Sequence, residues 1–157
     1  DVARSAELRR ALPALAALAG GIGDPLVRNR GTIGGSIANN DPAADHPSAL
    51  LALSGVVVTN QRDIAADDFF TGMFSTALES SELITRLRFD IPKRAAYATY
   101  PNPASRYALV GVFVADTATG VRVAVTGSRA RRPSTTRSAR APNVASASSA
   151  CSANSHS

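Results

Sequence analysis

A short glycine-rich segment carries the residue types in this sequence that are best suited to bind a ligand. Three glycines fall within five positions, at Gly31, Gly34 and Gly35, and a glycine lets a ligand approach the main chain without meeting a Cβ. The hydroxyls of Thr32 and Ser36 lie beside them and add two hydrogen-bond donors. Because consecutive backbone N–H groups in a turn form a concavity for anions, the spacing predicts a loop that binds phosphates.

Two carboxylates follow the glycine-rich segment, at Asp41 and Asp45. Their spacing allows the chain to return to the same ligand, where a carboxylate accepts hydrogen bonds from sugar hydroxyls or ring N–H groups. Glycines and acids together indicate a nucleotide. A purely structural interpretation is equally open, in which the segment is a turn and Asp45 caps the helix that begins near Pro47. Neither common phosphate motif, G-x-x-x-x-G-K-[ST] or G-x-G-x-x-G after a strand, is present.

The run from Ile22 to Ser36, continuing through Asp45, resembles the second flavin-binding motif in the FAD subunit of molybdenum hydroxylases. That family includes aerobic carbon monoxide dehydrogenase and xanthine dehydrogenase. The similarity continues through residues 65–70 and 101–111 and extends over roughly residues 5–128. It implies FAD as the cofactor, with these contacts: Gly31, Thr32, Ile33, Gly34, Gly35, Ser36, Asp41, Asp45 and Ile84.

The resemblance also implies a function and partners. In complete enzymes of the family, a molybdenum-cofactor large subunit oxidises the substrate, and an iron–sulfur small subunit relays electrons to FAD, which passes them to an acceptor such as NAD or a quinone. The FAD subunit binds, orients and tunes the flavin, so we predict no catalytic side chain and no metal site in this chain. The family's first flavin motif, an A-G-G-x-S-type loop, is not found in the sequence, and we therefore expect a truncated subunit.

Composition sets further limits. The 157 residues, 45% of them hydrophobic, allow one or two small domains with a core. No apolar run is long enough to span a membrane. A single cysteine, Cys151, excludes an internal disulfide and a cysteine-ligated iron–sulfur cluster within the chain. The first residues show no secretory leader, so we expect a cytoplasmic protein.

The net charge of +5 is concentrated at the C-terminal end of the sequence. Residues 129–157 hold five arginines and no acid, which leaves twelve basic and twelve acidic residues in the rest of the chain. This Ser/Ala/Arg-rich tail has too few apolar residues to fold, so we expect disorder. The alternative function is a non-catalytic truncated product, or a binding module whose basic tail engages nucleic acid or an acidic surface. Without aromatic side chains the tail has no stacking platform, so we predict no specific nucleic-acid binding.

Periodicity predicts the elements around the glycine-rich segment. A helix capped by Ser5 should reach Gly20–Gly21, with a kink at Pro13. A short helix should follow over residues 47–53, and a strand over 56–59. Residues 84–91 alternate, which predicts a half-exposed strand with Leu87, Phe89 and Ile91 facing inward.

The last predicted element is a hairpin over residues 106–126 with apolar side chains on both faces. In the family, helices that follow this hairpin cover it, and the tail here offers none, so we expect an exposed hydrophobic hairpin. The predicted fold class is α+β. Residues 1–91 should form the second subdomain of a two-subdomain FAD-binding fold, and residues 92–128 the first hairpin of the C-terminal flavoprotein domain.

Overall fold

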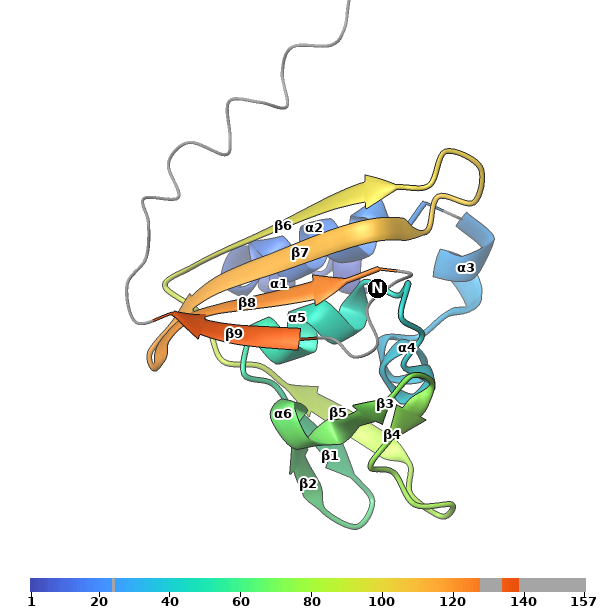
Figure 1. Cartoon of the computed structure of the whole chain (residues 1–157), viewed down its shortest axis with the longest axis vertical. Coiled ribbons are helices and arrows are strands. Elements are labelled where there is room, and N and C mark those ends of the chain that lie inside the picture. The colour runs from blue at the N-terminus through green and yellow to red at the C-terminus, as the bar shows by residue number, and fades with distance from the viewer. Residues whose placement is uncertain (24, 128–133, 139–157) are drawn as a thin grey trace, which may run out of the picture.

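The computed structural model describes residues 1–23, 25–127 and 134–138 of the chain. Figure 1 shows a larger antiparallel sheet with helices on one face, and a smaller sheet below it. The helices are η1 (Val2–Arg4), α1 (Ala6–Ala11), α2 (Pro13–Gly21), α3 (Pro25–Arg30), α4 (Ile33–Asn39), α5 (His46–Ala52) and α6 (Ala66–Phe69). The strands are β1 (Val56–Thr59), β2 (Asp63–Ala65), β3 (Phe70–Gly72), β4 (Ser75–Thr76), β5 (Ile84–Arg88), β6 (Arg94–Pro101), β7 (Ala108–Thr117), β8 (Gly120–Thr126) and β9 (Ser134–Ser138). This mixture of helices and antiparallel strands confirms the α+β class. No helix in these ranges has the length and hydropathy that a membrane span requires.

The first predicted helix is two helices, α1 and α2. The hydroxyl of Ser5 accepts a hydrogen bond from the amide of Leu8 at 3.2 Å, which confirms the predicted cap. Leu12 leaves the helical conformation, with φ −136° and ψ 61°, because a residue before proline is disfavoured in the α region. The chain then restarts as α2 at Pro13, whose missing N–H costs nothing in a first turn.

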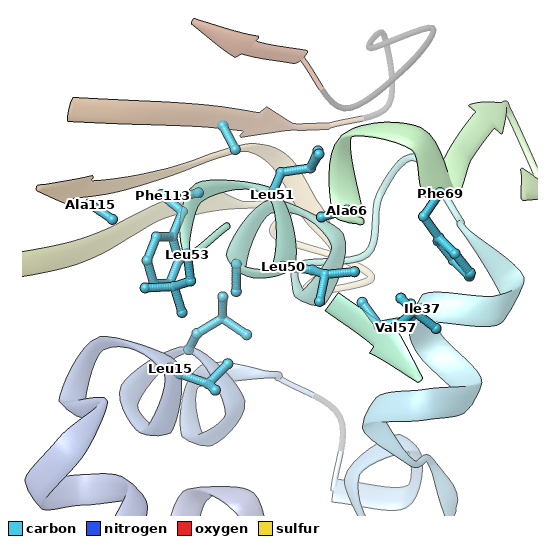
Figure 2. Packing of buried hydrophobic residues seen from close by; sticks show 14 of the residues in the cluster. Leu15, Ile37, Leu50, Leu51, Leu53, Val57, Ala66, Phe69, Phe113 and Ala115 are labelled. Atoms are coloured by element: carbon cyan, nitrogen blue, oxygen red, sulfur yellow. The ribbon is translucent and has the colours of Figure 1, made fainter. Parts of the chain in front are cut away.

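The large sheet has the strand order β6-β7-β8-β9, and α2 and α5 pack on one of its faces. Figure 2 shows the side chains that meet there, among them Leu15 from α2, Leu53 after α5 and Phe113 from β7. The core continues without a break toward the small sheet, where Val57 is also fully buried. Residues 1–91 and 92–127 therefore share one hydrophobic core.

Within the described residues, helices cover one face of the predicted hairpin and not the other. Along β7 and β8, Phe113, Ala115 and Ala124 are fully buried, whereas Val112 and Val123 on the other face are half-buried. The expectation that the hairpin is uncovered was wrong for the inner face, because α2 and α5, which precede it in sequence, pack against it. The turn between the strands forms as predicted, with Gly120 at φ 121°, where glycine is favoured.

Part of the basic tail belongs to the sheet. Residues 134–138 form β9 and pair antiparallel with β8, with Val121 opposite Ser138 and Val125 opposite Ser134. The expected disorder was therefore wrong for these five residues. An edge strand presents unpaired N–H and C=O groups that a polar segment can pair with, so main-chain bonding does not require apolar side chains. The rest of the predicted disordered tail lies outside the described residues.

The small sheet has the order β2-β1-β5, with both neighbours antiparallel to β1. Strand β5 ends at Arg88, which pairs with Val56, the first residue of β1. The prediction that the strand continues inward-facing to Ile91 was wrong, since Ile91 is 71% exposed. No β1 residue remains beyond Val56 to pair with, so the chain leaves the sheet and crosses to β6.

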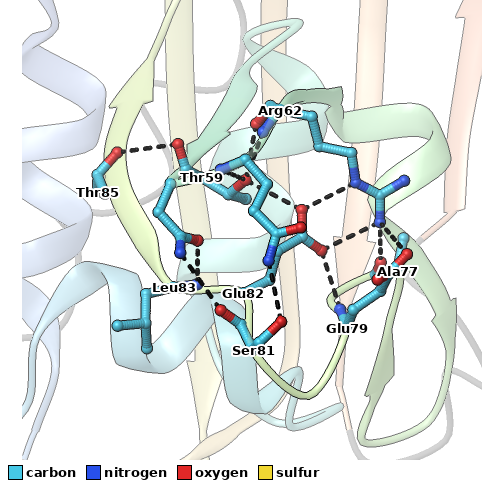
Figure 3. Close-up of polar contacts among 10 residues, drawn as sticks. Thr59, Arg62, Ala77, Glu79, Ser81, Glu82, Leu83 and Thr85 are labelled. Carbon is cyan, nitrogen blue, oxygen red and sulfur yellow. Dashed lines mark hydrogen bonds and ion pairs between the residues drawn. The ribbon is translucent and has the colours of Figure 1, made fainter.

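A buried carboxylate fixes the outer end of the small sheet (Figure 3). Glu82 accepts hydrogen bonds from the guanidinium of Arg62 at 2.8 and 3.0 Å, from the hydroxyl of Thr59 at 3.0 Å and from the amide of Glu79 at 2.9 Å. The hydrogen bonds from Arg62 are the main reason that the pKa of Glu82 falls to about 2. This network joins the β1–β2 turn to the loop that precedes β5.

Candidate functional site

Most of the glycine-rich segment is a helix, α4, and not the predicted loop, although Gly31 precedes the helix. Thr32 caps it: the amide of Gly35 donates to the Thr32 hydroxyl at 2.9 Å, and the amide of Ser36 donates to the Thr32 carbonyl at 3.0 Å. The capping threonine offers these amides partners, so the chain turns into a helix. Gly34 and Gly35 lie within α4, and neither is among the described residues with positive φ. The cap thus occupies the amides of Gly35 and Ser36, and the predicted anion-binding concavity stays a prediction.

The chain after α4 is held in place by the two-stranded sheet β3-β4 and by the large sheet. Asn40 has the left-handed conformation, with φ 45°, and its side-chain amide donates to the carbonyls of Gly72 at 2.6 Å and Ser75 at 2.9 Å. The hydroxyl of Thr126 lies 2.8 Å from the carbonyl oxygen of Pro42 and 2.7 Å from that of Ala44, so its one hydrogen is shared. These contacts fix the path of residues 40–45 between α4 and α5.

The two predicted carboxylates lie on this path. The carboxylate of Asp41 accepts a hydrogen bond from the amide of Ala43 at 2.9 Å, in a local turn. Asp45 stands at the cap position of α5, but its side chain makes no capping bond. Its carboxylate accepts a hydrogen bond from the hydroxyl of Tyr97 on β6. A helix cap, the structural alternative for Asp45, therefore does not explain where its carboxylate lies.

Burial changes the proton affinity of the groups around Asp45. It raises the pKa of the Asp45 carboxyl, and the Tyr97 hydrogen bond works in the opposite direction. Burial, followed by the bond to Asp45, raises the pKa of the Tyr97 phenol. The neighbouring His46 is only 8% exposed, and its burial lowers its pKa to about 4. His46 is therefore neutral near pH 7.

A cavity of about 410 Å³ opens between α3, α4, the chain from Asp41 to His46 and the β6–β7 loop. Figure 1 shows α3 and α4 at the same end of the large sheet as this loop. Six of the nine predicted ligand contacts line it: Gly31, Thr32, Gly35, Ser36, Asp41 and Asp45. The lining also includes Ile22, Gly23, Val27, Arg30, Asn39, Ala43, Ala44, His46, Ser105, Arg106 and Tyr107. The structure thus brings most of the predicted contacts to one place.

The other three predicted contacts lie outside the lining. Ile33 and Ile84 are partly buried against the hydrophobic core. Gly34 faces Ile84, since a Cβ added at Gly34 would lie 3.8 Å from the Ile84 Cγ2. Helix α4 therefore presents one glycine to the cavity and the other to strand β5.

Several lining residues were not among the predicted contacts. The sequence offered no reason to expect Arg30 or His46, since arginines in a turn are commonly solvated and a lone histidine has no partner at metal spacing. The Nε2 of His46 is buried without a hydrogen-bond partner in the part of the chain that the structure describes. Arg106 and Tyr107 lie in residues 101–111, which resemble the FAD subunit family, and this resemblance could have pointed to them. Arg106 also contacts Gly23, where an added Cβ would lie 2.5 Å from the Arg106 Cβ.

A cavity lined by glycines, hydroxyls and carboxylates has the groups that a nucleotide needs, and the family comparison identifies the class as a flavoprotein. Residues 1–93 match the family described as "FAD binding domain in molybdopterin dehydrogenase". The chain belongs to this family, and its cofactor is FAD. The predicted relationship to the FAD-binding medium subunit of molybdenum hydroxylases is thereby confirmed.

Named relatives agree with this assignment. The chain is 38% identical over 138 residues to the nicotine 6-hydroxylase medium subunit of Paenarthrobacter nicotinovorans, covering 80% of this chain and 48% of the relative. It is 41% identical over 92 residues to the carbon monoxide dehydrogenase medium chain of Hydrogenophaga pseudoflava, and this match covers 56% of this chain and 32% of the relative. These relatives are subunits of oxidoreductases. The chain spans half or less of the length of each of these relatives.

A solved structure shows the same fold. The carbon monoxide dehydrogenase of Hydrogenophaga pseudoflava aligns with a TM-score of 0.76 and 33% identity, over 86% of this chain and 51% of that chain. Quinoline 2-oxidoreductase from Pseudomonas putida aligns with a TM-score of 0.73 and 26% identity, over 83% of this chain and 49% of that chain. Both alignments extend beyond the 93 residues of the family match.

The cavity residues fit FAD. A Cβ at Gly35 would lie 3.0 Å from the Thr32 hydroxyl oxygen, and one at Gly31 would lie 2.7 Å from the Val27 carbonyl oxygen. Both positions therefore favour glycine, which leaves main chain open to a ligand. The lining combines hydroxyl and guanidinium donors with carboxylate acceptors, the groups that bind phosphates and sugar hydroxyls.

Proposed function

We propose that this chain is the FAD-binding part of the medium subunit of a molybdenum hydroxylase. Bound FAD would accept electrons from an iron–sulfur partner subunit and pass them to an acceptor such as NAD or a quinone. A molybdenum-cofactor large subunit would oxidise the substrate. The observation that carries this proposal is the convergence of six predicted contacts on one cavity, in a chain whose first 93 residues match an FAD-binding family.

Five of the lining residues would have definite tasks. Arg30, with the hydroxyls of Thr32 and Ser36, would donate to the phosphate oxygens, while Gly35 keeps the main chain accessible. Asp45 would accept a hydrogen bond from a sugar hydroxyl or a ring N–H. The protein thus binds and orients the cofactor, and the redox chemistry belongs to the flavin.

The three predicted contacts outside the lining would act at the edge of this site. Ile33, Gly34 and Ile84 would support α4 from the side of β5 and bring apolar surface near the flavin ring. Residues 1–91 would be the FAD-binding unit, and residues 92–128 the beginning of the next domain. A cytoplasmic location is part of the same proposal and agrees with the single cysteine.

The proposal is tested by mapping where FAD binds. The isotopically labelled 157-residue chain is titrated with FAD, and the backbone amide signals are followed by NMR. We expect the largest shifts at residues 30–36, 41–46 and 105–107, which line the cavity, and none in β2, which lies in the small sheet away from it. Absence of FAD binding, or shifts confined to other surfaces, would contradict the proposal.

A further inference from the structure

Tyr97 lies outside the FAD-binding family match, which ends at residue 93, yet its side chain reaches the candidate FAD site. It projects from β6 on the face of the large sheet that α2 and α5 cover. Its hydroxyl donates to the Oδ1 atom of Asp45, a residue 52 positions earlier in the chain. The hydroxyl itself is not part of the cavity lining, so Tyr97 can act there only through Asp45.

The large sheet determines where the Tyr97 hydroxyl lies. The ring packs against Phe113, its partner in the register of β6 and β7, with 5.9 Å between ring centroids. The hydroxyl passes over Gly111, where an added Cβ would lie 2.5 Å from the Tyr97 oxygen. A side chain at position 111 would therefore displace the phenol, and glycine leaves it room to reach Asp45.

The bond from Tyr97 occupies one oxygen of Asp45 and leaves the other for a ligand. Oδ2 has no hydrogen-bond partner in the described ranges, and it is not among the fully buried atoms without a partner. Asp45 itself lines the cavity. The donor on Oδ1 restricts rotation of the carboxylate and, by partly offsetting the effect of burial, favours its ionised form.

We propose that Tyr97 is a positioning residue for FAD, which holds the Asp45 carboxylate so that Oδ2 accepts a hydrogen bond from the cofactor. This inference rests on the proposed function. It makes the large sheet a part of the flavin site, because β6 carries the tyrosine, and Phe113 and Gly111 on β7 fix its ring. FAD affinity then depends on residues beyond the FAD-binding family match.

The test compares Tyr97→Phe with Tyr100→Phe in the full chain. Tyr97→Phe removes only the hydroxyl and keeps the ring that packs on Phe113. Tyr100 lies on the same strand, and its side chain is 65% exposed. Ligand-observed NMR, which detects weak binding, gives the Kd for FAD. We expect Tyr97→Phe to raise the Kd about tenfold and Tyr100→Phe to leave it unchanged.

A double-mutant cycle separates positioning from a general structural role. In an Asp45→Ala background the phenol has no carboxylate to hold, so Tyr97→Phe should cause no further loss of FAD affinity. The same loss in both backgrounds would overturn the inference, as would an unchanged Kd in Tyr97→Phe alone.

Failure of the proposed function gives a different pattern. If the wild-type chain does not bind FAD, or if Gly35→Val binds it as well as wild type, the cavity is not the flavin site. If Gly35→Val weakens binding while Tyr97→Phe does not, the flavin site stands and the role of Tyr97 is refuted.

Discussion

The guanidinium of Arg122 on β8 donates to the carbonyl oxygen of Leu51 in α5 at 2.9 Å, although the arginine side chain is only 2% exposed. Its other end pairs with the carboxylate of Asp67 in α6 at 2.5 Å. One buried charge thus joins the large sheet to two helices of the FAD-binding family region. This pairing matters because a buried charge is tolerated only with good partners.

Arg122→Met should lower the free energy of unfolding by about 2–4 kcal/mol, because the Leu51 carbonyl loses its guanidinium donor and keeps only backbone amide donors, such as that of Ser54 at 3.3 Å, and because Asp67 loses its counter-ion. The measurement is urea unfolding at pH 7. Arg86→Met is the matched control, since Arg86 is exposed on β5 and makes no ion pair in the described ranges. Equal, small losses in the two variants would show that the buried pair adds little.

Gly35→Val should abolish FAD binding. The added Cβ would lie 3.0 Å from the capping hydroxyl of Thr32, and the branched methyl groups would enter the cavity. Because Gly35 is helical, the reason is lost space and a disturbed cap rather than backbone strain. Gly21→Val is the control, since a Cβ at Gly21 meets no atom within 4 Å. Isothermal titration with FAD measures both variants, and unchanged affinity in Gly35→Val would exclude this helix from the site.

Asp45→Asn should weaken FAD binding less than Gly35→Val does, by about 1–2 kcal/mol. Asparagine keeps an oxygen that accepts from Tyr97 and loses only the charge. The Kd for FAD, measured for both variants at constant ionic strength, shows which substitution weakens binding more. A loss as large as that of Gly35→Val would mean that the carboxylate charge dominates binding.

His46 should make the protein less stable in mild acid. Its pKa is about 4 in the folded chain and near 6.5 when unfolded. Between these values the unfolded state binds a proton that the folded state does not, so the free energy of unfolding decreases as the pH falls from 6.5 toward 4. The loss from this residue should be about 2–3 kcal/mol.

Urea unfolding at pH 7 and at pH 4.5 measures this effect in the wild-type chain and in His46→Gln. The variant has no titrating group at this position, so its stability should change less between the two pH values. A pH dependence identical to that of wild type would assign the acid sensitivity to other groups.

Local signals in the sequence determined much of this protein. The Ser5 cap, the break at Pro13 and the turn at Gly120 depend on residues within a few positions, so the sequence alone predicted them correctly. The similarity of residues 22–45 also identified the FAD-binding family, because the motif lies in one continuous segment. The conformation of that segment was not predicted: Thr32 caps a helix that includes Gly34 and Gly35.

Only the tertiary structure decided which residues meet across the chain. The bond between Tyr97 and Asp45 joins positions 52 residues apart, and the contact of Thr126 with Pro42 joins positions 84 apart. The inner face of the β7–β8 hairpin is covered by helices that precede it, and β9 pairs through its main chain in a segment whose side chains predict disorder. Such contacts depend on the packing of whole elements, and neither periodicity nor spacing encodes that packing locally.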